Sequence, residues 1–215
     1  EYVTRLAADM MRRGIDIRLA SPIDAVRRTQ AGAEVKTQGA NWEKFDEVVF
    51  ATHSDDTLAM LSDANAVETS ILGAIRYQPN KIVLHSDTSI MPKRRQVWSS
   101  WIYSEDAQRT DTEINLTYWM NSLQPWLKGE DMMVTLNTNR PIREELIWDE
   151  VTLQHPVYDL AAIAAQDAAA AINGSNHTWF CGAWMKNGFH EDGLSSALDV
   201  VNTLNAARSM DLAAE

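Results

Sequence analysis

The sequence has little cysteine, few basic residues and no long apolar run, and each shortage excludes a class of protein. One cysteine in 215 residues, Cys181, excludes an internal disulfide framework and a cysteine-rich zinc module, and favours a cytoplasmic location. The 19 basic residues against 30 acidic ones give a net charge of −11, which argues against a nucleic-acid partner. The apolar runs are far shorter than the roughly 20 residues that cross a bilayer, so no integral membrane segment is expected.

The nine glycines and five histidines do not form a known ligand-binding motif. No Gly-x-Gly-x-x-Gly and no phosphate-binding loop is present, so the sequence has no dinucleotide fingerprint of its own. The dipeptide His190-Glu191 lacks the second histidine that a zinc-binding helix needs, and the other histidines are scattered singly. We therefore expect no metal site.

The length and the 45% apolar content are sufficient for one large domain or two small ones. The sequence begins at Glu1 and opens directly on the helical pattern of Tyr2 to Arg13. We expect that upstream sequence has been removed.

The first third of the sequence predicts short elements around a buried strand. Gly14 ends the opening helix, and the Ala25–Arg28 and Ala33–Thr37 runs resemble a hairpin. Val48-Val49-Phe50-Ala51 is nearly all apolar, as in a parallel strand buried on both faces. The other expected elements are a strand over Ile15–Ala20 and a helix over Asp55–Leu61 that Ser54 or Asp55 caps.

The middle third predicts a mostly antiparallel sheet. Its expected strands are Lys81–His85, Gln96–Tyr103, Glu113–Met120, Met132–Asn137 and Glu145–Val151. Five of the eight tryptophans lie in this part of the chain. They would form either an aromatic core or an aromatic-lined pocket for a flat or apolar ligand.

The last third returns to helices, with an alanine-rich helix over Asp159–Ile172, a buried strand over Thr178–Cys181 and a final helix from Gly193. Between the last two lies a glycine-rich loop, residues 182–193. Glycines there allow positive φ and close backbone approach to a ligand, and a helix start offers N–H groups. A plain structural turn is the alternative.

The order of these segments resembles the C-terminal half of a flavin-containing amine oxidoreductase, in the bacterial group of predicted NAD/FAD-binding amine oxidase-like proteins. The matching stretches include "SPIDAVRR", "FDEVVFATHSDDTLAML", "VLHSDTSIMPKRRQVWSSWIY", "HPVYD" and "TWFCGAWMKNGFHEDGLSSAL". The resemblance implies an α/β fold with α+β character, in which a truncated FAD-binding Rossmann-type part joins a mostly antiparallel-sheet substrate domain. Residues 1–62 and 176–210 would be the C-terminal elements of the FAD-binding domain, and 63–175 the substrate-binding domain.

The resemblance also implies a cofactor, FAD, and the residues that contact it. Val26 would approach the adenine side and Thr52 the pyrophosphate. The remaining contacts come from the glycine-rich loop, namely Gly182, Ala183, Trp184, Gly188, Phe189, His190, Glu191, Asp192, Gly193 and Leu194. Ala183 stands where many relatives carry an acid, so only backbone contact is implied there. We expect FAD in the full-length protein and none in this fragment alone.

The resemblance implies an FAD-dependent oxidoreductase that transfers a hydride equivalent from a small-molecule substrate to flavin. His190 and Asp192 are the candidates for proton handling. The substrate pocket would be lined by Trp98, Trp101, Tyr103, Trp119 and Trp148. The lysine that many amine oxidases carry in the substrate domain is not identified in this sequence.

Two alternatives stay open: a binding or oligomerisation module without chemistry, and a lipid-handling flavoprotein that would use the same pocket. We further expect apolar faces of Val48–Phe50 and Trp179–Cys181 to be uncovered in the fragment, which would make it self-associate. Cys181, in a strand, is expected to be structural and not a nucleophile.

Overall fold

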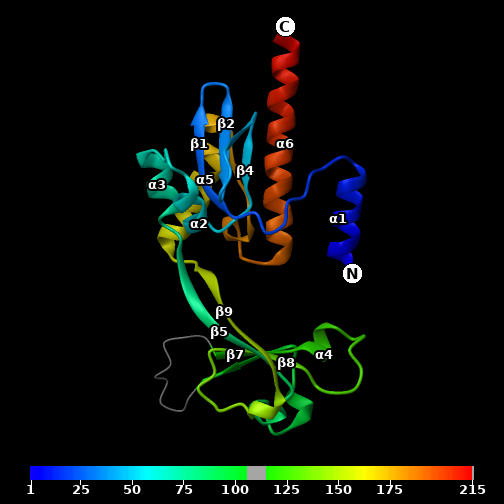
Figure 1. Cartoon of the computed structure of the whole chain (residues 1–215). Helices are drawn as coiled ribbons and strands as arrows, with labels where there is room; N and C mark the ends of the chain where they lie inside the picture. Colours follow the sequence, from blue (N-terminus) through cyan, green and yellow to red (C-terminus); the bar gives the residue numbers. More distant parts are fainter. Residues whose placement is uncertain (106–114, 215) are drawn as a thin grey trace. The chain divides into compact units, whose positions relative to one another are not determined.

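The computed structural model describes residues 1–105 and 115–214 and divides the chain into two compact units. Unit 1 is Glu1–Arg76 with Val157–Glu215, and unit 2 is Tyr77–Pro156. The fold is mixed α/β with mostly antiparallel sheets, which confirms the expected fold class (Figure 1). No described helix combines the length and the apolar composition that crossing a membrane requires.

Unit 1 contains an antiparallel sheet and a parallel pair of strands. The antiparallel sheet has the order β1-β2-β3, and the parallel pair is β10-β4. Their bounds are Ile23–Thr29 for β1, Gly32–Thr37 for β2, Trp42–Phe45 for β3, Val48–Phe50 for β4 and Thr178–Phe180 for β10. The predicted hairpin and the predicted parallel strand are both present.

Two helices of unit 1, α3 and α5, begin where a side chain accepts hydrogen bonds from their first N–H groups. Asp159 accepts a hydrogen bond from the Ala162 N–H at 2.9 Å, and Asn65 with Glu68 forms a reciprocal capping box. The helices are α1 (Tyr2–Arg12), α2 (Ser54–Met60), α3 (Ala66–Leu72), α5 (Leu160–Ile172) and α6 (His190–Ala214), with the 3₁₀ turns η4 (Ser175–His177) and η5 (Ala183–Met185).

The core of unit 1 forms around β10. Trp179 and Cys181 pack against Val200 of α6, and the Phe180 ring stacks on Phe50 of β4 at 6.0 Å. The Trp179 indole donates to Glu47 at 2.7 Å, which satisfies its one polar atom. The side chains of β10 are therefore buried by this chain itself, contrary to the expectation that they would be uncovered. The expected exposure holds for Val49, on β4, which is 47% exposed and so not buried on both faces.

Unit 2 is a five-stranded sheet of order β6-β7-β8-β5-β9, in which the pairs β6–β7, β7–β8 and β8–β5 are antiparallel. The strands are β5 (Arg76–His85), β6 (Trp101–Ser104), β7 (Asn115–Trp119), β8 (Met133–Leu136) and β9 (Ile147–Val157). The short helices are α4 (Met120–Leu123) and the 3₁₀ turns η1 (Thr88–Ile90), η2 (Arg95–Val97) and η3 (Glu144–Leu146). The expected strand from 113 starts within residues that the structure does not describe.

Several expected boundaries were wrong. Ile15–Ala20 is not a strand: Ala20 has φ +51°, and Arg18 reaches out to Glu43 of β3, a strand that was not expected. Helix α2 has His53 at its N-cap position, and the structure places Ser54 inside the helix. Helix α6 begins at His190, three residues before the expected start at Gly193.

The unit boundaries differ from the expected domain boundaries. They fall near residues 76 and 157 instead of 62 and 176, because α3 and α5 pack on each other within unit 1. Alanine side chains on α5, Ala162, Ala165 and Ala169, are buried there. Their small size allows close helix packing.

Candidate functional site

The candidate site in unit 1 lies at the carboxyl ends of β4 and β10. The two strands are parallel, so the loops that follow them leave the same edge of the sheet. The Trp184 indole, after β10, donates a 3.0 Å hydrogen bond to the carbonyl of Thr52, after β4. Trp184 is buried, so this bond joins the two loops from inside.

Two glycines of the loop have conformations that other residues rarely adopt. Gly182 has φ +149° and Gly188 has φ +88°. A Cβ on Gly182 would lie 2.8 Å from the Trp184 indole, and one on Gly188 would lie 2.6 Å from the Tyr158 hydroxyl. Contacts within the chain thus account for both glycines, as the structural-turn alternative predicts.

A buried serine and a glutamine hold the loop in place. The Ser196 hydroxyl accepts from the Gly182 N–H at 2.9 Å and donates to the Gly193 carbonyl at 2.8 Å. The Gln166 amide of α5 donates to the carbonyls of Trp184 and Lys186 at 2.8 and 2.5 Å. The loop is therefore supported by both α5 and α6.

The start of α6 offers fewer N–H groups than the sequence suggested. Asp192 Oδ2 accepts from the Phe189 N–H at 2.9 Å, and the Gly193 N–H donates to the Phe189 carbonyl. Glu191 and Asp192 place two carboxylates in the first turn, where they interact favourably with the helix dipole. An anionic ligand would meet these carboxylates at this helix end.

The two candidates for proton handling have different partners. His190 Nε2 lies 3.2 Å from the hydroxyl of Tyr2 on α1, whereas the Asp192 carboxylate accepts a hydrogen bond from the Phe189 N–H. His190, Phe189 and Leu194 are exposed at this end of α6. The structure therefore gathers the loop residues around one sheet edge without pairing His190 with Asp192.

Val26, the residue expected near adenine, is buried inside unit 1. Its carbonyl accepts from the backbone N–H and the hydroxyl of Ser62 at 2.9 and 3.0 Å. Ile23, at the start of the same strand, is exposed instead and lines a cavity of about 360 Å³ together with Phe45 and Val49. Sequence reasoning missed this cavity because β3, which supplies Phe45, was not expected.

The rim of this cavity is charged. Arg18 donates two hydrogen bonds to the Glu43 carboxylate at 2.6 and 3.0 Å, and Asp16 accepts a third at 2.7 Å. The hydrogen bond from Arg18 lowers the pKa of Glu43 below its ordinary value. Glu43 thus stays ionised beside an apolar floor.

His53, Asp55 and Asp56 form a group whose potential metal-ligand atoms, an imidazole nitrogen and two carboxylate oxygens, lie within 4.8 Å of one another. The two carboxylates are exposed in the first turn of α2, where they complement the helix dipole without an ion. Cys181 packs with Trp179 and Val200, and this burial raises the pKa of its thiol above the ordinary value.

The sheet of unit 2 presents one face on which every described cross-strand neighbour is apolar. Opposite residues of paired strands share a face, so the registers define two rows across β6, β7, β8 and β5. We call these two rows the apolar face: Trp101, Tyr118, Val134 and Leu84, and Tyr103, Leu116, Leu136 and Ile82. All eight side chains are half-buried or exposed, with Tyr103 at 61% and Trp101 at 50%.

The opposite face is buried although much of it is polar. The His85 Nδ1 accepts from the Asp87 N–H at 3.1 Å, so its Nε2 carries the proton and donates to the Thr135 hydroxyl at 2.8 Å. Thr135 in turn bonds Thr117 at 2.9 Å. Burial lowers the pKa of His85, and Arg143 hydrogen bonds hold the pKa of the buried Asp87 far below its ordinary value.

The five aromatic residues expected to line one pocket lie in three different surroundings. Trp101 and Tyr103 belong to the apolar face. Trp98 and Trp119 meet edge to face at 5.3 Å under the Arg95 guanidinium, which pairs with Asp131. Trp148 is exposed on β9, with its indole nitrogen 3.4 Å from the Ser86 hydroxyl.

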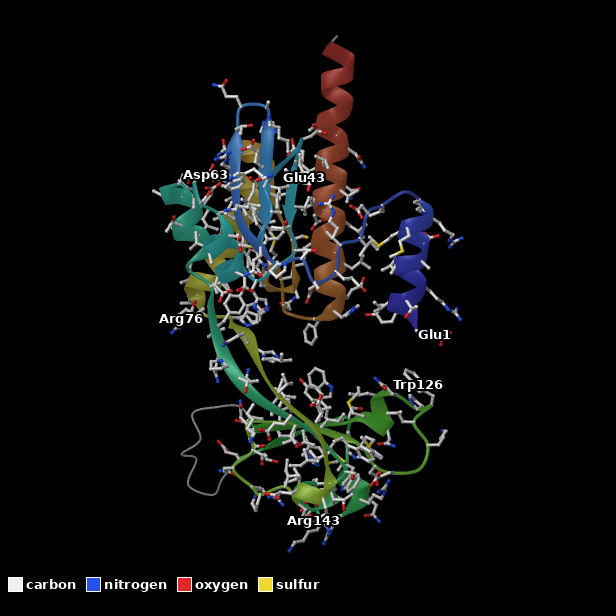
Figure 2. The ribbon with its side chains drawn as sticks, viewed as in Figure 1. Glu1, Glu43, Asp63, Arg76, Trp126 and Arg143 are labelled. Carbon is white, nitrogen blue, oxygen red and sulfur yellow. The ribbon has the colours of Figure 1, made fainter. Side chains whose placement is uncertain are left out.

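The cluster of Trp98, Trp119, Arg95 and Asp131 is thus a self-contained stacking arrangement. Trp126, not among the expected pocket residues, is the most exposed tryptophan of this unit and lies after α4, outside the strands (Figure 2). Of the five residues expected to line the pocket, only Trp101 and Tyr103 therefore lie on the apolar face.

Comparisons with known proteins show similarity in fold. No protein-family model and no curated protein matches the chain. Among solved structures, a fatty acid isomerase from P. acnes matches with TM-score 0.57 and 15% identity over 85% of this chain and 47% of its own. Putrescine oxidase, in wild-type form bound to putrescine, matches with TM-score 0.59 and 10% identity over 95% of this chain and 52% of its own.

The chain spans about half the length of these solved structures. At such identity the likeness is one of fold alone. The two neighbours are named for different substrates, a fatty acid and a diamine, so the fold does not choose between them.

Proposed function

We propose that the chain is part of an FAD-dependent oxidoreductase of the amine oxidase type, which transfers a hydride equivalent from a small-molecule substrate to flavin. The fold neighbours support the general kind, flavin-dependent oxidoreductases, and the sequence resemblance extends it to this type. In this proposal unit 1 contacts the flavin and unit 2 the substrate. The sequence-based domains were residues 1–62 with 176–210 for FAD and 63–175 for the substrate. In the proposal, unit 1 takes the place of the first domain and unit 2 that of the second.

The observation that carries the proposal is the sheet edge at β4 and β10. Two loops leave that edge together, joined by the bond from Trp184 to Thr52, and one of them is kept close to the backbone of α6 by Ser196. Ligands of open α/β sheets bind outside the carboxyl ends of parallel strands. Phe189 and Leu194 add exposed apolar surface beside this backbone, which suits a flat ring.

The residues present fit the two parts of FAD unequally. The apolar surface and backbone groups of the loop suit the isoalloxazine ring, whereas Glu191 and Asp192 oppose a phosphate at the start of α6. When bound, FAD would supply the hydride acceptor. The chain's own residues would exclude water through Phe189 and Leu194 and hold a proton at His190 Nε2.

The proposal predicts the flavin content of two preparations. The full-length protein should be isolated with a visible flavin absorption band, and the 215-residue chain alone should bind no stoichiometric FAD, because no phosphate-binding loop is present in its sequence. A full-length protein that stays colourless after incubation with FAD would overturn the proposal. A coloured 215-residue chain would show that the phosphates are bound here after all.

A variant tests the sheet edge itself. Trp184→Phe keeps an aromatic ring but removes the indole N–H that bonds Thr52, so the two loops should separate and flavin content per full-length chain should fall. Trp126→Phe, at an exposed position of unit 2, is the matched control and should retain flavin. Equal flavin content in both variants would contradict the assignment of this edge.

Self-association remains a further proposal for the 215-residue chain. Exposed apolar side chains on β4 and α6, Val49, Leu194, Leu198 and Val201, support it. Light scattering at micromolar concentration should then give a mass above one chain. A strict monomer would contradict it and, with it, the oligomerisation-module alternative.

A further inference from the structure

A relay of hydrogen bonds in unit 2 fixes the orientation of His155. The Lys81 backbone N–H donates to Asn137 Oδ1 at 2.9 Å, Asn137 Nδ2 donates to Asn80 Oδ1 at 2.6 Å, and Asn80 Nδ2 lies 2.9 Å from His155 Nδ1. The backbone of Asn137 is in the left-handed region, with φ +50°, and its own N–H donates a hydrogen bond to the Lys81 carbonyl. Asn80, in the middle of the relay, is buried, so solvent competes little for its hydrogen bonds.

The direction of the relay follows from its first donor. A backbone N–H can only donate, so the Asn137 oxygen must face Lys81, and its NH₂ group must then face the oxygen of Asn80. The NH₂ group of Asn80 therefore faces His155 Nδ1, which has to accept. The neutral imidazole consequently carries its proton on Nε2, and within the described residues no hydrogen bond to Nε2 is found.

His155 lies on the same side of the sheet as the apolar face. Alternation along β5 puts Asn80 on the side of Ile82 and Leu84, and the bond from Asn80 brings His155 of β9 to that side. Lys81 follows Asn80 on β5, and Glu150 lies five residues before His155 on β9, so alternation directs both side chains to the other side of the sheet. They form an ion pair there. Val151 and Leu153, which alternate with His155 along β9, are exposed and extend the apolar surface toward it.

We infer that unit 2 binds a long-chain carboxylic acid, with its hydrocarbon part on the apolar face and its head group accepting a hydrogen bond from His155 Nε2. An uncharged apolar surface favours hydrocarbon, whereas it offers the ammonium groups of a diamine only aromatic rings and no carboxylate partner to replace their hydration. A carboxylate only accepts hydrogen bonds, which matches the donor that the relay presents. As a substrate class, this inference rests on the proposed function; as a binding site, it does not.

The tautomer of His155 provides a test that needs no ligand. Nitrogen NMR of the 215-residue chain distinguishes an imidazole protonated at Nε2 from one protonated at Nδ1. We expect the Nε2–H form in the wild type and a mixture of tautomers in Asn80→Leu, which removes the donor to Nδ1. A wild-type His155 protonated at Nδ1 would overturn the inference.

The ligand test uses oleate as the probe and calorimetric titration of the 215-residue chain. His155→Phe keeps a ring but removes the donor, and should weaken oleate binding about tenfold, the loss expected for one hydrogen bond to a charged group. His155→Gln, which retains an N–H donor, should recover part of it. Trp126→Ser, outside the apolar face, is the control and should bind oleate as the wild type does.

A second pair of measurements examines the hydrocarbon part and the charge. Tyr103→Ser should weaken oleate binding several-fold, because it removes an exposed ring of the apolar face. Oleylamine has the same chain length but a head group that only donates, so His155→Phe should not weaken its binding. Each ratio compares wild type and variant with the same head group, so it isolates the contribution of His155.

Each outcome decides for or against the site. No oleate binding, equal oleate binding by wild type and His155→Phe, or equal loss for oleate and oleylamine in His155→Phe would overturn the inference. No flavin is present in these titrations. If the chain binds oleate but the full-length protein takes up no flavin, the proposed function is overturned and this site stands. If the full-length protein takes up flavin but the chain binds no oleate, this site is overturned and the proposed function stands.

Discussion

The central strands of the two units differ in which of their side chains are buried. In unit 1 the buried strand β10 is apolar in its middle, with Trp179 and Phe180 inside. In unit 2 the buried face of the sheet carries His85, Thr117 and Thr135, while the apolar rows are the more exposed. Both units bury apolar side chains, but unit 2 also leaves two apolar rows of its sheet partly exposed, which is typical of a surface that contacts a ligand.

The largest expected effect tests the apolar interior of unit 1. Phe180→Ala should lower the free energy of unfolding by about 3–5 kcal/mol, since the ring is 1% exposed and stacks on Phe50. Urea denaturation followed by tryptophan fluorescence measures the change. A loss below about 1 kcal/mol would mean that β10 is less well packed than its burial indicates.

The next prediction separates two glycines of the same loop. Gly182→Ala should cost about 1–3 kcal/mol, because φ +149° is a glycine conformation and the new Cβ would meet the Trp184 indole. Gly193→Ala should be neutral or stabilise by about 0.5–1 kcal/mol, because Gly193 lies in the first turn of α6.

Thermal melts of both glycine variants measure the difference. The nearest atom to a Cβ on Gly193 is 3.7 Å away, an ordinary contact, so the chain itself does not require glycine there. The expectation that Gly193 lies beside the flavin rests on the resemblance alone. Flavin loss in full-length Gly193→Ala without loss of stability would support that contact, and equal destabilisation of both variants would contradict the loop geometry.

Sequence reasoning succeeded where the signal was local. The hairpin of β1 and β2, the alanine-rich helix α5 and the stop at Gly14 follow from turn chemistry and helix propensity within a few residues. The helix α3 was missed although Asn65 and Glu68 carry a capping-box pattern. The signal was present there and was not used.

Other features depend on contacts between distant residues. The division of five aromatic residues among three surroundings depends on Arg95 reaching Asp131 and on the register of Trp101 with Tyr118. The relay to His155 joins residues 56 to 75 positions apart. Local propensity does not encode such pairings, because they form only when the sheet register is set.

The acid stability of unit 2 should depend on His85. Burial places its folded-state pKa below the ordinary 6.5, although the nearby Asp87 opposes this, so only the unfolded chain takes up a proton as the pH falls through about 6.5. Its contribution to stability is complete above that pH and decreases toward the lower folded-state pKa. Asp87, whose pKa is lowered from 3.8, loses its own contribution only at more acidic pH.

Urea midpoints between pH 7.5 and 4.5 should therefore fall for the wild type. They should fall less for His85→Gln, which lacks the titrating imidazole. His190→Gln, at an exposed position of unit 1, is the control and should keep the wild-type slope. An unchanged slope in His85→Gln would assign the acid sensitivity to other groups.

The smallest expected effect concerns the exposed side of unit 2. Tyr103→Ser should change the free energy of unfolding by no more than about 0.5 kcal/mol, because the side chain is 61% exposed at an edge strand of the sheet. Urea denaturation beside Phe180→Ala gives the comparison directly. A loss of about 2 kcal/mol would mean that the ring is packed as a core residue is, and the apolar face would then stabilise the fold instead of remaining available to a ligand.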